Sequence, residues 1–185
     1  MTVIGITGQV GSGKTFAVEQ MKTYLSFNTI DLDHIGHHCL KEPSIKKVLI
    51  TVFGDHILKD GEIDRKVLGA EVFSDIKKLQ QLNKVVHPMI KENVIKALQS
   101  SSQKVSVIVG ALIKEIGLMN FCDYIIVLDS NRKKARKASN RKMIAEAYQL
   151  SQDEYKSLST NIVYNNFDKI FAKDLKKMVH NLLIN

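Results

Sequence analysis

The most constraining stretch of the chain is residues 8–15, which read Gly-Gln-Val-Gly-Ser-Gly-Lys-Thr. This stretch fits the phosphate-loop pattern of Gly, four residues, and Gly-Lys-Ser/Thr without a mismatch. The preceding run, 3–7, is short, mostly apolar and β-branched, which is typical of a buried parallel strand. After the loop, Val18, Met21 and Leu25 recur at three- and four-residue steps, as on the apolar face of a helix. The sequence therefore predicts a strand, a phosphate-binding loop and a helix in that order.

The residue types of the loop indicate its chemistry. Glycines let successive backbone N–H groups turn inward around phosphate oxygens, and the following helix adds the positive end of its dipole. A lysine at this position reaches the β- and γ-phosphates, and the next hydroxyl can bind Mg²⁺. A chance glycine-rich turn is the alternative, but both flanks favour a nucleoside triphosphate site. The predicted binding residues are Gly8, Gly11, Ser12, Gly13, Lys14 and Thr15, with Thr15 at the metal.

The size and composition suit one soluble globular domain. The 185 residues, 44% hydrophobic and 25% charged, can bury a substantial core. No apolar run approaches the ~20 residues that span a membrane, and the N-terminus leads directly into a strand. Cys39 and Cys122 are solitary and far apart, which indicates neither a disulfide framework nor a metal knuckle. We expect a cytoplasmic protein without a membrane anchor or signal peptide.

The net charge of +8 is concentrated in one segment. Residues 132–142 contain seven basic side chains and no acidic one, so they account for most of the excess. Such a segment can close over nucleotide phosphates, bind nucleic acid or form a solvated helix surface. The first interpretation is favoured in a chain that carries a phosphate loop.

Two carboxylates follow the second predicted strand, 27–30. Asp31 and Asp33 stand at its C-terminal end, the edge at which open α/β sheets bind ligands. We expect different roles for them, one facing the phosphate loop and the other stabilising the turn. The alternative is that both cap the next helix.

From there to about residue 100 the pattern is helical. Caps that begin helices are predicted at Ser44, Asp64 and Asp75. The pair His87-Pro88 is expected to interrupt the last of these helices, with Pro88 in the first turn of another. This helical excursion between two strands predicts a substrate-binding insertion beside the sheet.

Three further strands are predicted at 105–109, 124–128 and 161–164, followed by a terminal helix from Asp168. Strands therefore alternate with helices, and no internal repeat is evident. This alternation predicts a three-layer α/β domain with a parallel sheet.

With these residues in place, the chain resembles the dephospho-coenzyme A kinase family, whose members phosphorylate a ribose 3′-hydroxyl to complete coenzyme A. The likeness runs from the first strand to the last. A phosphate loop alone is common to many proteins, whereas the accompanying blocks in this order are far more selective. Those blocks are Ile30-Asp31-Leu32-Asp33, Asp60-Gly61 with Asp64-Arg65, His87-Pro88, Leu112-Ile113 with Glu115, and Asn165-Asn166.

The resemblance implies a single P-loop kinase domain, with ATP and Mg²⁺ as cofactors and dephospho-CoA as acceptor. Its core would comprise about 1–40, 104–130 and 160–185, with a helical acceptor-binding insertion over 41–103 and a lid over 131–159. No membrane or nucleic-acid partner is implied, and we expect a monomer or a weak homo-oligomer.

Position by position, the resemblance also implies roles. Asp33 would be the catalytic base and Lys14 the second catalytic residue. The implied acceptor-binding residues are Asp31, Arg65 and His87, and further ATP contacts are implied at Arg141 and Asn165. For His87 the alternative is a structural imidazole that caps the turn before Pro88.

The chain also departs from the family pattern. The family usually has Gly at the position of Gln9, Arg at that of His37, and Pro at that of Ala111. In the lid, Gln and Arg positions fall on Lys134, Lys137 and Arg141, a further Arg on Ala145, and the Gly after Asn165-Asn166 on Phe167. Lysine neutralises phosphate but lacks the bidentate fork of arginine.

Three functions are weighed. The first is dephospho-CoA kinase, and the second is another small P-loop kinase that acts on a nucleoside or nucleotide. The third is a degenerate, non-catalytic nucleotide or RNA binder. Retention of Lys14, Thr15 and Asp33 argues against the third.

Overall fold

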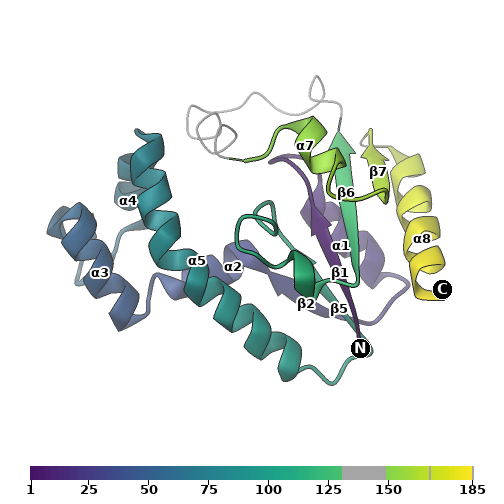
Figure 1. Cartoon of the computed structure of the whole chain (residues 1–185), viewed down its shortest axis with the longest axis horizontal. Helices are drawn as coiled ribbons and strands as arrows, with labels where there is room; N and C mark the ends of the chain where they lie inside the picture. The colour runs from purple at the N-terminus through teal and green to yellow at the C-terminus, as the bar shows by residue number, and fades with distance from the viewer. Residues whose placement is uncertain (131–148, 167, 185) are drawn as a thin grey trace.

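A five-stranded parallel sheet lies at the centre of the computed structural model, which describes residues 1–130, 149–166 and 168–184. Its strands are β1 (Thr2–Thr7), β2 (Asn28–Asp31), β5 (Val105–Val109), β6 (Tyr124–Ser130) and β7 (Ile162–Asn165). Their order is β2-β5-β1-β6-β7, so β1 is the middle strand and pairs with β5 and β6 (Figure 1). The predicted parallel sheet is confirmed.

Side chains that alternate along the strands build a core on each face of the sheet. Val105, Val107 and Val109 belong to the cluster formed with α1 (Lys14–Lys22) and α8 (Lys169–Ile184). Ile108, between them in sequence, belongs instead to the cluster formed with α5 (Ile76–Gln99). Successive strand residues point to opposite faces, so a wholly apolar strand requires cover on both sides. The three-layer α/β class is therefore confirmed.

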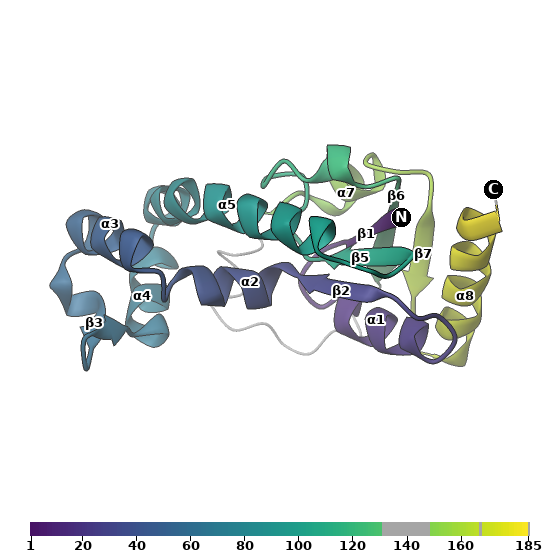
Figure 2. The same ribbon diagram turned by 90° about the horizontal axis from the view of Figure 1, so that it is seen from below.

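Between β2 and β5 the chain forms a helical arm. The arm consists of α2 (Leu32–Cys39), α3 (Pro43–Phe53), η1 (Asp55–Ile57), β3 (Leu58–Lys59), β4 (Glu62–Ile63), α4 (Arg65–Val72) and α5. Figure 2 shows α3 and α4 at the end of the molecule far from α8, with α5 running back toward the sheet. The helix α5 packs against α2, α3 and α4 along a stripe of buried residues, Leu79, Val86, Ile90, Val94 and Leu98.

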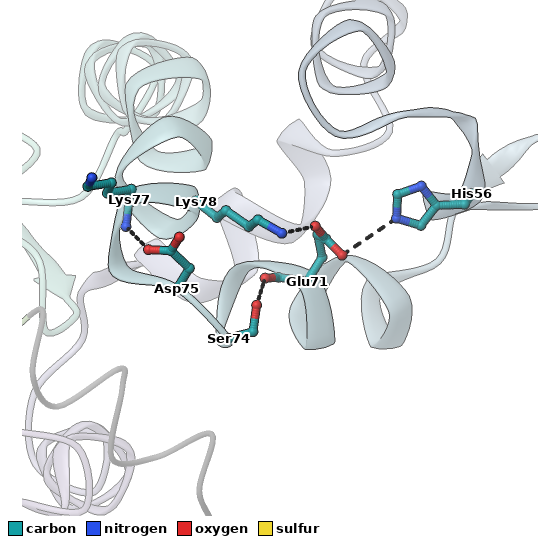
Figure 3. A network of polar contacts seen from close by, with 6 residues as sticks. All are labelled: His56, Glu71, Ser74, Asp75, Lys77 and Lys78. Atoms are coloured by element: carbon teal, nitrogen blue, oxygen red, sulfur yellow. Dashed lines mark hydrogen bonds and ion pairs between the residues drawn. The ribbon is translucent and has the colours of Figure 1, made fainter.

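Glu71 of α4 ties three elements of the arm together (Figure 3). One of its carboxylate oxygens pairs with Nζ of Lys78 in α5, and the other lies 3.6 Å from Nε2 of His56 in η1. The hydrogen bond from Lys78 is the main cause of the lowered pKa of Glu71. Asp75 caps α5 by accepting from the backbone N–H of Lys77 at 2.8 Å. These contacts hold α4 against the beginning of α5.

Two predictions about the arm are wrong. The helix α5 continues through Pro88, although proline lacks the N–H that would bond the carbonyl of Lys84. The buried stripe on both sides of Pro88 stabilises the uninterrupted helix. The predicted cap at Ser44 is also wrong, because α3 begins at Pro43 with Glu42 as its N-cap residue. Proline suits the first helical position, where its missing N–H is not needed.

The remaining elements are short. η2 (Met119–Phe121) precedes β6, and α7 (Gln152–Lys156) begins with a capping box between Ser151 and Glu154. In the described part of the chain, none of the helices has the length and hydropathy that a membrane span requires.

Candidate active site

The loop between β1 and α1 has the backbone of an anion site. Gly8, Gly11 and Gly13 have φ angles of 143°, 84° and 91°. A Cβ on Gly8 would lie 2.4 Å from the carbonyl oxygen of Leu128, so the position tolerates only glycine. Gly13 precedes α1 in a left-handed conformation, and no side chain of the described residues caps this helix. The first-turn N–H groups are thus available to phosphate oxygens.

Lys14 lies folded back over the loop. Its Nζ donates to the carbonyl oxygens of Gly8 at 2.8 Å and Gln9 at 3.0 Å. Burial lowers the pKa of Lys14 to about 8, while the nearby carboxylate of Asp33 acts in the opposite direction. Phosphate oxygens in the loop would add negative charge beside this ammonium and favour its charged form further. Thr15, the predicted metal residue, is exposed in the first turn of α1.

Two segments that are distant in sequence hydrogen-bond to the loop. The side-chain amide of Asn165, at the end of β7, donates to the carbonyl oxygen of Ser12 at 2.9 Å. The backbone N–H of Val10 donates to Oε1 of Gln149 at 3.2 Å. The hydroxyl of Ser12 is buried and makes no hydrogen bond to the described residues. Asn165, expected from the resemblance as an ATP contact, therefore contacts the loop itself through Ser12, whereas no local pattern indicated Gln149.

The two carboxylates after β2 differ in what they contact. Oδ1 of Asp31 accepts from the backbone N–H groups of Asp33 at 2.9 Å and His34 at 3.0 Å, so Asp31 caps α2. Asp33 already lies in the first turn of α2, and its carboxylate borders the cleft beside the loop. The expectation of separate roles agrees with these contacts. The alternative that both residues cap the helix is wrong for Asp33.

A cleft of about 1080 Å³ opens beside the loop, between α2, α4, α5 and the β3–β4 hairpin. Apolar side chains from all three helices line it, including Leu32, Leu68 and Ile90. The cleft reaches the phosphate loop at Val10. Its charged and titratable lining residues are Asp33, His37, Lys59, Asp60, Asp64, Arg65, Lys66 and His87. An apolar pocket with a few polar groups, adjoining an anion site, suits an extended phosphorylated molecule.

Arg65 is the first residue of α4, directly after the cap residue Asp64. Its Nη2 donates to Nε2 of His37 on α2 at 2.7 Å. Because a guanidinium has no acceptor, this nitrogen of His37 must be unprotonated. Burial and then the charge of Arg65 lower the pKa of His37, whereas Asp33 and Asp31 act to raise it. The predicted acceptor residue Arg65 thus lies at the cleft together with His37.

His87 also lines the cleft, from the middle of α5. The predicted alternative, in which His87 caps a turn before Pro88, is wrong because no turn interrupts the helix there. Burial lowers the pKa of His87, and a hydrogen bond with the backbone of Glu115 partly offsets this effect. A neutral imidazole at this place can accept or donate one hydrogen bond to a ligand.

Asp129, at the C-terminal end of β6, is a polar residue whose role the sequence did not reveal. It is 6% exposed, and its Oδ2 lies 2.9 Å from Nζ of Lys156 in α7. Its Oδ1 accepts from the side-chain amide of Gln152. Tyr155, between these two α7 residues, donates to the carbonyl oxygen of Ala111 at 2.7 Å. These contacts fix α7 over the sheet edge beside the phosphate loop.

Three departures from the family pattern lie in the described residues. His37 contacts Arg65, the carbonyl oxygen of Ala111 accepts from Tyr155, and Nε2 of Gln9 donates to the carbonyl oxygen of Leu150 at 3.2 Å. The departures at Lys134, Lys137, Ala145 and Phe167 lie outside the described residues, as does the predicted ATP contact Arg141.

Comparisons with known proteins identify the family of the chain. The sequence profile of the family CoaE, dephospho-CoA kinase, matches residues 2–170. The chain is 31% identical over 190 residues to the dephospho-CoA kinase of Dehalococcoides mccartyi, an alignment that covers 97% of this chain and 94% of that protein.

Solved structures show the same fold. TT1252 from Thermus thermophilus superposes with a TM-score of 0.77 at 21% identity, covering 99% of this chain and 96% of that chain. The dephospho-CoA kinase from Campylobacter jejuni has a TM-score of 0.71 at 22% identity and covers 97% and 96%. The sequence match over nearly the whole length, together with this fold, establishes that the chain belongs to the dephospho-CoA kinase family.

Proposed function

We propose that the loop 8–15 binds ATP, that the adjoining cleft binds dephospho-CoA, and that the γ-phosphoryl group passes to the ribose 3′-hydroxyl. As a member of its family, the chain is a dephospho-CoA kinase and acts at the last step of coenzyme A biosynthesis. The arrangement of the cleft against the loop supports this assignment of the two sites.

One observation carries the proposal. Asp33 and Val10 of the phosphate loop line the same cleft, and the carboxylate of Asp33 acts to raise the pKa of Lys14. Lys14 belongs to the ATP loop, so Asp33 lies where the two substrates would meet. A carboxylate at such a junction can orient an attacking hydroxyl and accept its proton.

The reaction then proceeds as a single displacement. The hydroxyl oxygen bonds to the γ-phosphorus, the bond to the bridging β,γ-oxygen breaks, and ADP leaves. Asp33 takes the proton of the hydroxyl, and Lys14 exchanges the carbonyl oxygens of Gly8 and Gln9 for phosphate oxygens. Phosphoryl transfer requires mainly positioning and charge stabilisation, which these groups supply.

Mg²⁺ fits the residues at the loop. Thr15 offers an exposed hydroxyl oxygen in the first turn of α1. Mg²⁺ prefers oxygen ligands, and in nucleotide sites it takes most of them from phosphate groups and water molecules. When bound, the ion would neutralise part of the phosphate charge. Thr15 is the residue of this chain that we assign to it.

The acceptor would lie along the cleft. Arg65 and His87 are placed to contact its polar groups, and the apolar lining suits its uncharged portion. Asp31 contributes indirectly in this assignment, because its carboxylate holds the turn that places Asp33. The cytoplasmic location and the division into core, insertion and lid stay predictions.

The substitution Asp33→Asn tests the proposal. It keeps the shape of the side chain but removes its basicity, so kcat for CoA formation should fall by about 10²- to 10⁴-fold. The affinity for ADP, measured by calorimetry, should stay close to that of the wild type. Asp174→Asn, an exposed carboxylate of α8, is the matched control and should leave kcat unchanged.

Two results would count against the proposal. One is that folded wild-type protein forms no CoA from dephospho-CoA and Mg·ATP. The other is that a nucleoside or nucleotide acceptor is preferred over dephospho-CoA in the same coupled assay.

A further inference from the structure

The pair formed by His37 and Arg65 joins two elements that come together only in the folded chain. His37 lies in the last turn of α2, and Arg65 begins α4. Their side chains meet at the cleft with an Nε2-to-Nη2 distance of 2.7 Å. The guanidinium is permanently charged, whereas an imidazole can exist in a neutral or a protonated form.

The contact restricts the state of both side chains. The guanidinium donates, so the lone pair of His37 Nε2 is occupied and its remaining proton is on Nδ1. Protonation of Nε2 would replace this hydrogen bond with a repulsion between two cations. In the protein alone, Arg65 therefore favours the neutral form of His37.

An anionic ligand reverses this preference. A phosphate group that accepts hydrogen bonds from the guanidinium of Arg65 would leave Nε2 of His37 without its donor. The negative charge of the phosphate then favours the imidazolium form of His37. The protonated ring can donate to the same phosphate from Nε2. The two side chains would thus change from a donor–acceptor pair into two donors that share one anion.

We propose that His37 and Arg65 form a phosphate-binding pair of the acceptor cleft, in which binding of the anion is coupled to uptake of one proton by His37. The inference rests on the proposed function for the identity of the acceptor, whose diphosphate is the anion. Binding by the pair itself requires only that the ligand contains a diphosphate group.

Other charged groups around His37 set the background for its titration. Asp31, Asp33 and His34 lie at the beginning of α2, the helix that carries His37. The two aspartates act to raise the pKa of His37, and His34 acts to lower it. From the elements packed around the cleft come Lys59, Asp60, Asp64, Arg65 and Lys66, and α5 contributes His87. These groups are present with and without the ligand, so the change on binding comes from the anion and its contact with Arg65.

The linkage has a definite sign. The pKa of His37 is lowered in the free protein and would be raised in the complex. Between these two values the free ring is neutral and the bound ring is charged, so binding takes up a proton. The affinity for the anion then falls as pH rises, by at most about tenfold per pH unit.

Calorimetry measures this proton uptake directly. Dephospho-CoA is titrated into the full-length protein with ADP already in the loop, at pH 7, in buffers that differ in ionisation enthalpy. ADP fills the site of Lys14, so that Lys14 does not contribute, and comparison of the two proteins removes the contribution of His87, which lines the same cleft. We expect the wild type to take up a substantial fraction of a proton and His37→Gln to lose most of that uptake.

Two variants separate this role from a structural one. His37→Arg carries a permanent charge, so it should bind the acceptor without proton uptake and should lose less affinity than the wild type between pH 7 and 8.5. His38→Gln changes the neighbouring exposed histidine, which packs against His34 outside the cleft, and should retain the proton uptake.

Inorganic pyrophosphate, titrated in the same way, supplies a second probe. If pyrophosphate shows His37-dependent proton uptake but dephospho-CoA is neither bound nor phosphorylated, the pair stands and the proposed acceptor is wrong. If CoA is formed but proton uptake is the same in the wild type and His37→Gln, the pair is overturned and the proposed function stands. Absence of binding by both probes would also overturn the pair.

Discussion

Lys14 carries a charge that depends on what occupies the loop. In the protein alone its ammonium donates hydrogen bonds to two carbonyl oxygens, and burial lowers the pKa of Lys14 to about 8. Phosphate oxygens would favour the ammonium and raise this pKa. Above pH 8 the binding of nucleotide must therefore restore a proton to Lys14, which weakens the observed affinity.

This reasoning predicts how ADP affinity varies with pH. Without Mg²⁺, the Kd of ADP should rise as pH increases from 7 to 9, by up to about tenfold, since one protonation separates the free and bound states. Lys14→Ala should bind more weakly at both pH values and show a flatter profile. A pH profile of equal steepness in the two proteins would assign the titration to another group.

The sequence predicts contacts at the residue scale where the residues are contiguous. Gly8, Lys14 and Thr15 belong to one motif, and their positions follow from the loop and helix that the motif specifies. The pair of His37 and Arg65 brings together residues 28 positions apart, from helices whose relative placement depends on α5. No spacing in the sequence indicates this hydrogen bond, so the sequence marks His37 only as a departure from the family pattern.

At the scale of elements, α5 shows how packing overrides a local signal. Proline inside a helix costs about 3 kcal/mol in isolation, which is why an interruption at Pro88 was predicted. Val86 and Ile90 on either side of Pro88 are each 6% exposed, and both belong to one core cluster. Burying each of these apolar side chains contributes about 2 kcal/mol to stability. This gain offsets the cost of the proline and stabilises the continuous helix.

The stability of α5 should rise when the proline is removed. In Pro88→Ala the restored N–H can donate to the carbonyl of Lys84, and the loss of proline's rigidity in the unfolded chain offsets part of the gain. We expect an increase of about 1 kcal/mol in the free energy of unfolding, measured with urea. Gln81→Ala, at an exposed position of the same helix, should change it by less than about 0.5 kcal/mol. A clear loss of stability would mean that Pro88 contributes packing that α5 requires.

At the scale of the whole molecule, the alternation of apolar strands and helices was enough to predict the class of fold. Strands buried on both faces leave few arrangements other than a parallel sheet between two layers of helices. The strand order and the reach of the arm did not follow, because they depend on which segments pack against each other at long range. The cleft is a product of that packing, so its shape and lining could not be predicted from sequence periodicity.

The layer formed by α1 and α8 should be essential to the stability of the whole sheet. Leu175 of α8 is fully buried in the cluster that also contains Met21 and Ile126. Leu175→Ala should lower the free energy of unfolding by about 2–5 kcal/mol, a large part of the stability of a typical domain. Thermal and chemical denaturation measure this loss. Ile184→Ala, at a position 68% exposed in the same helix, is the control, and an equal loss there would contradict the importance of the buried layer.

The hydrogen bond from Asn165 to the carbonyl of Ser12 also bears on the order in which the enzyme can be made. The two residues are 153 positions apart, so a ribosome that has just released the phosphate loop has nearly the whole chain still to synthesise. Until β7 emerges, the loop lacks the amide that supports it from behind. A nascent chain that ends before Asn165 would therefore carry a nucleotide motif without its finished nucleotide site.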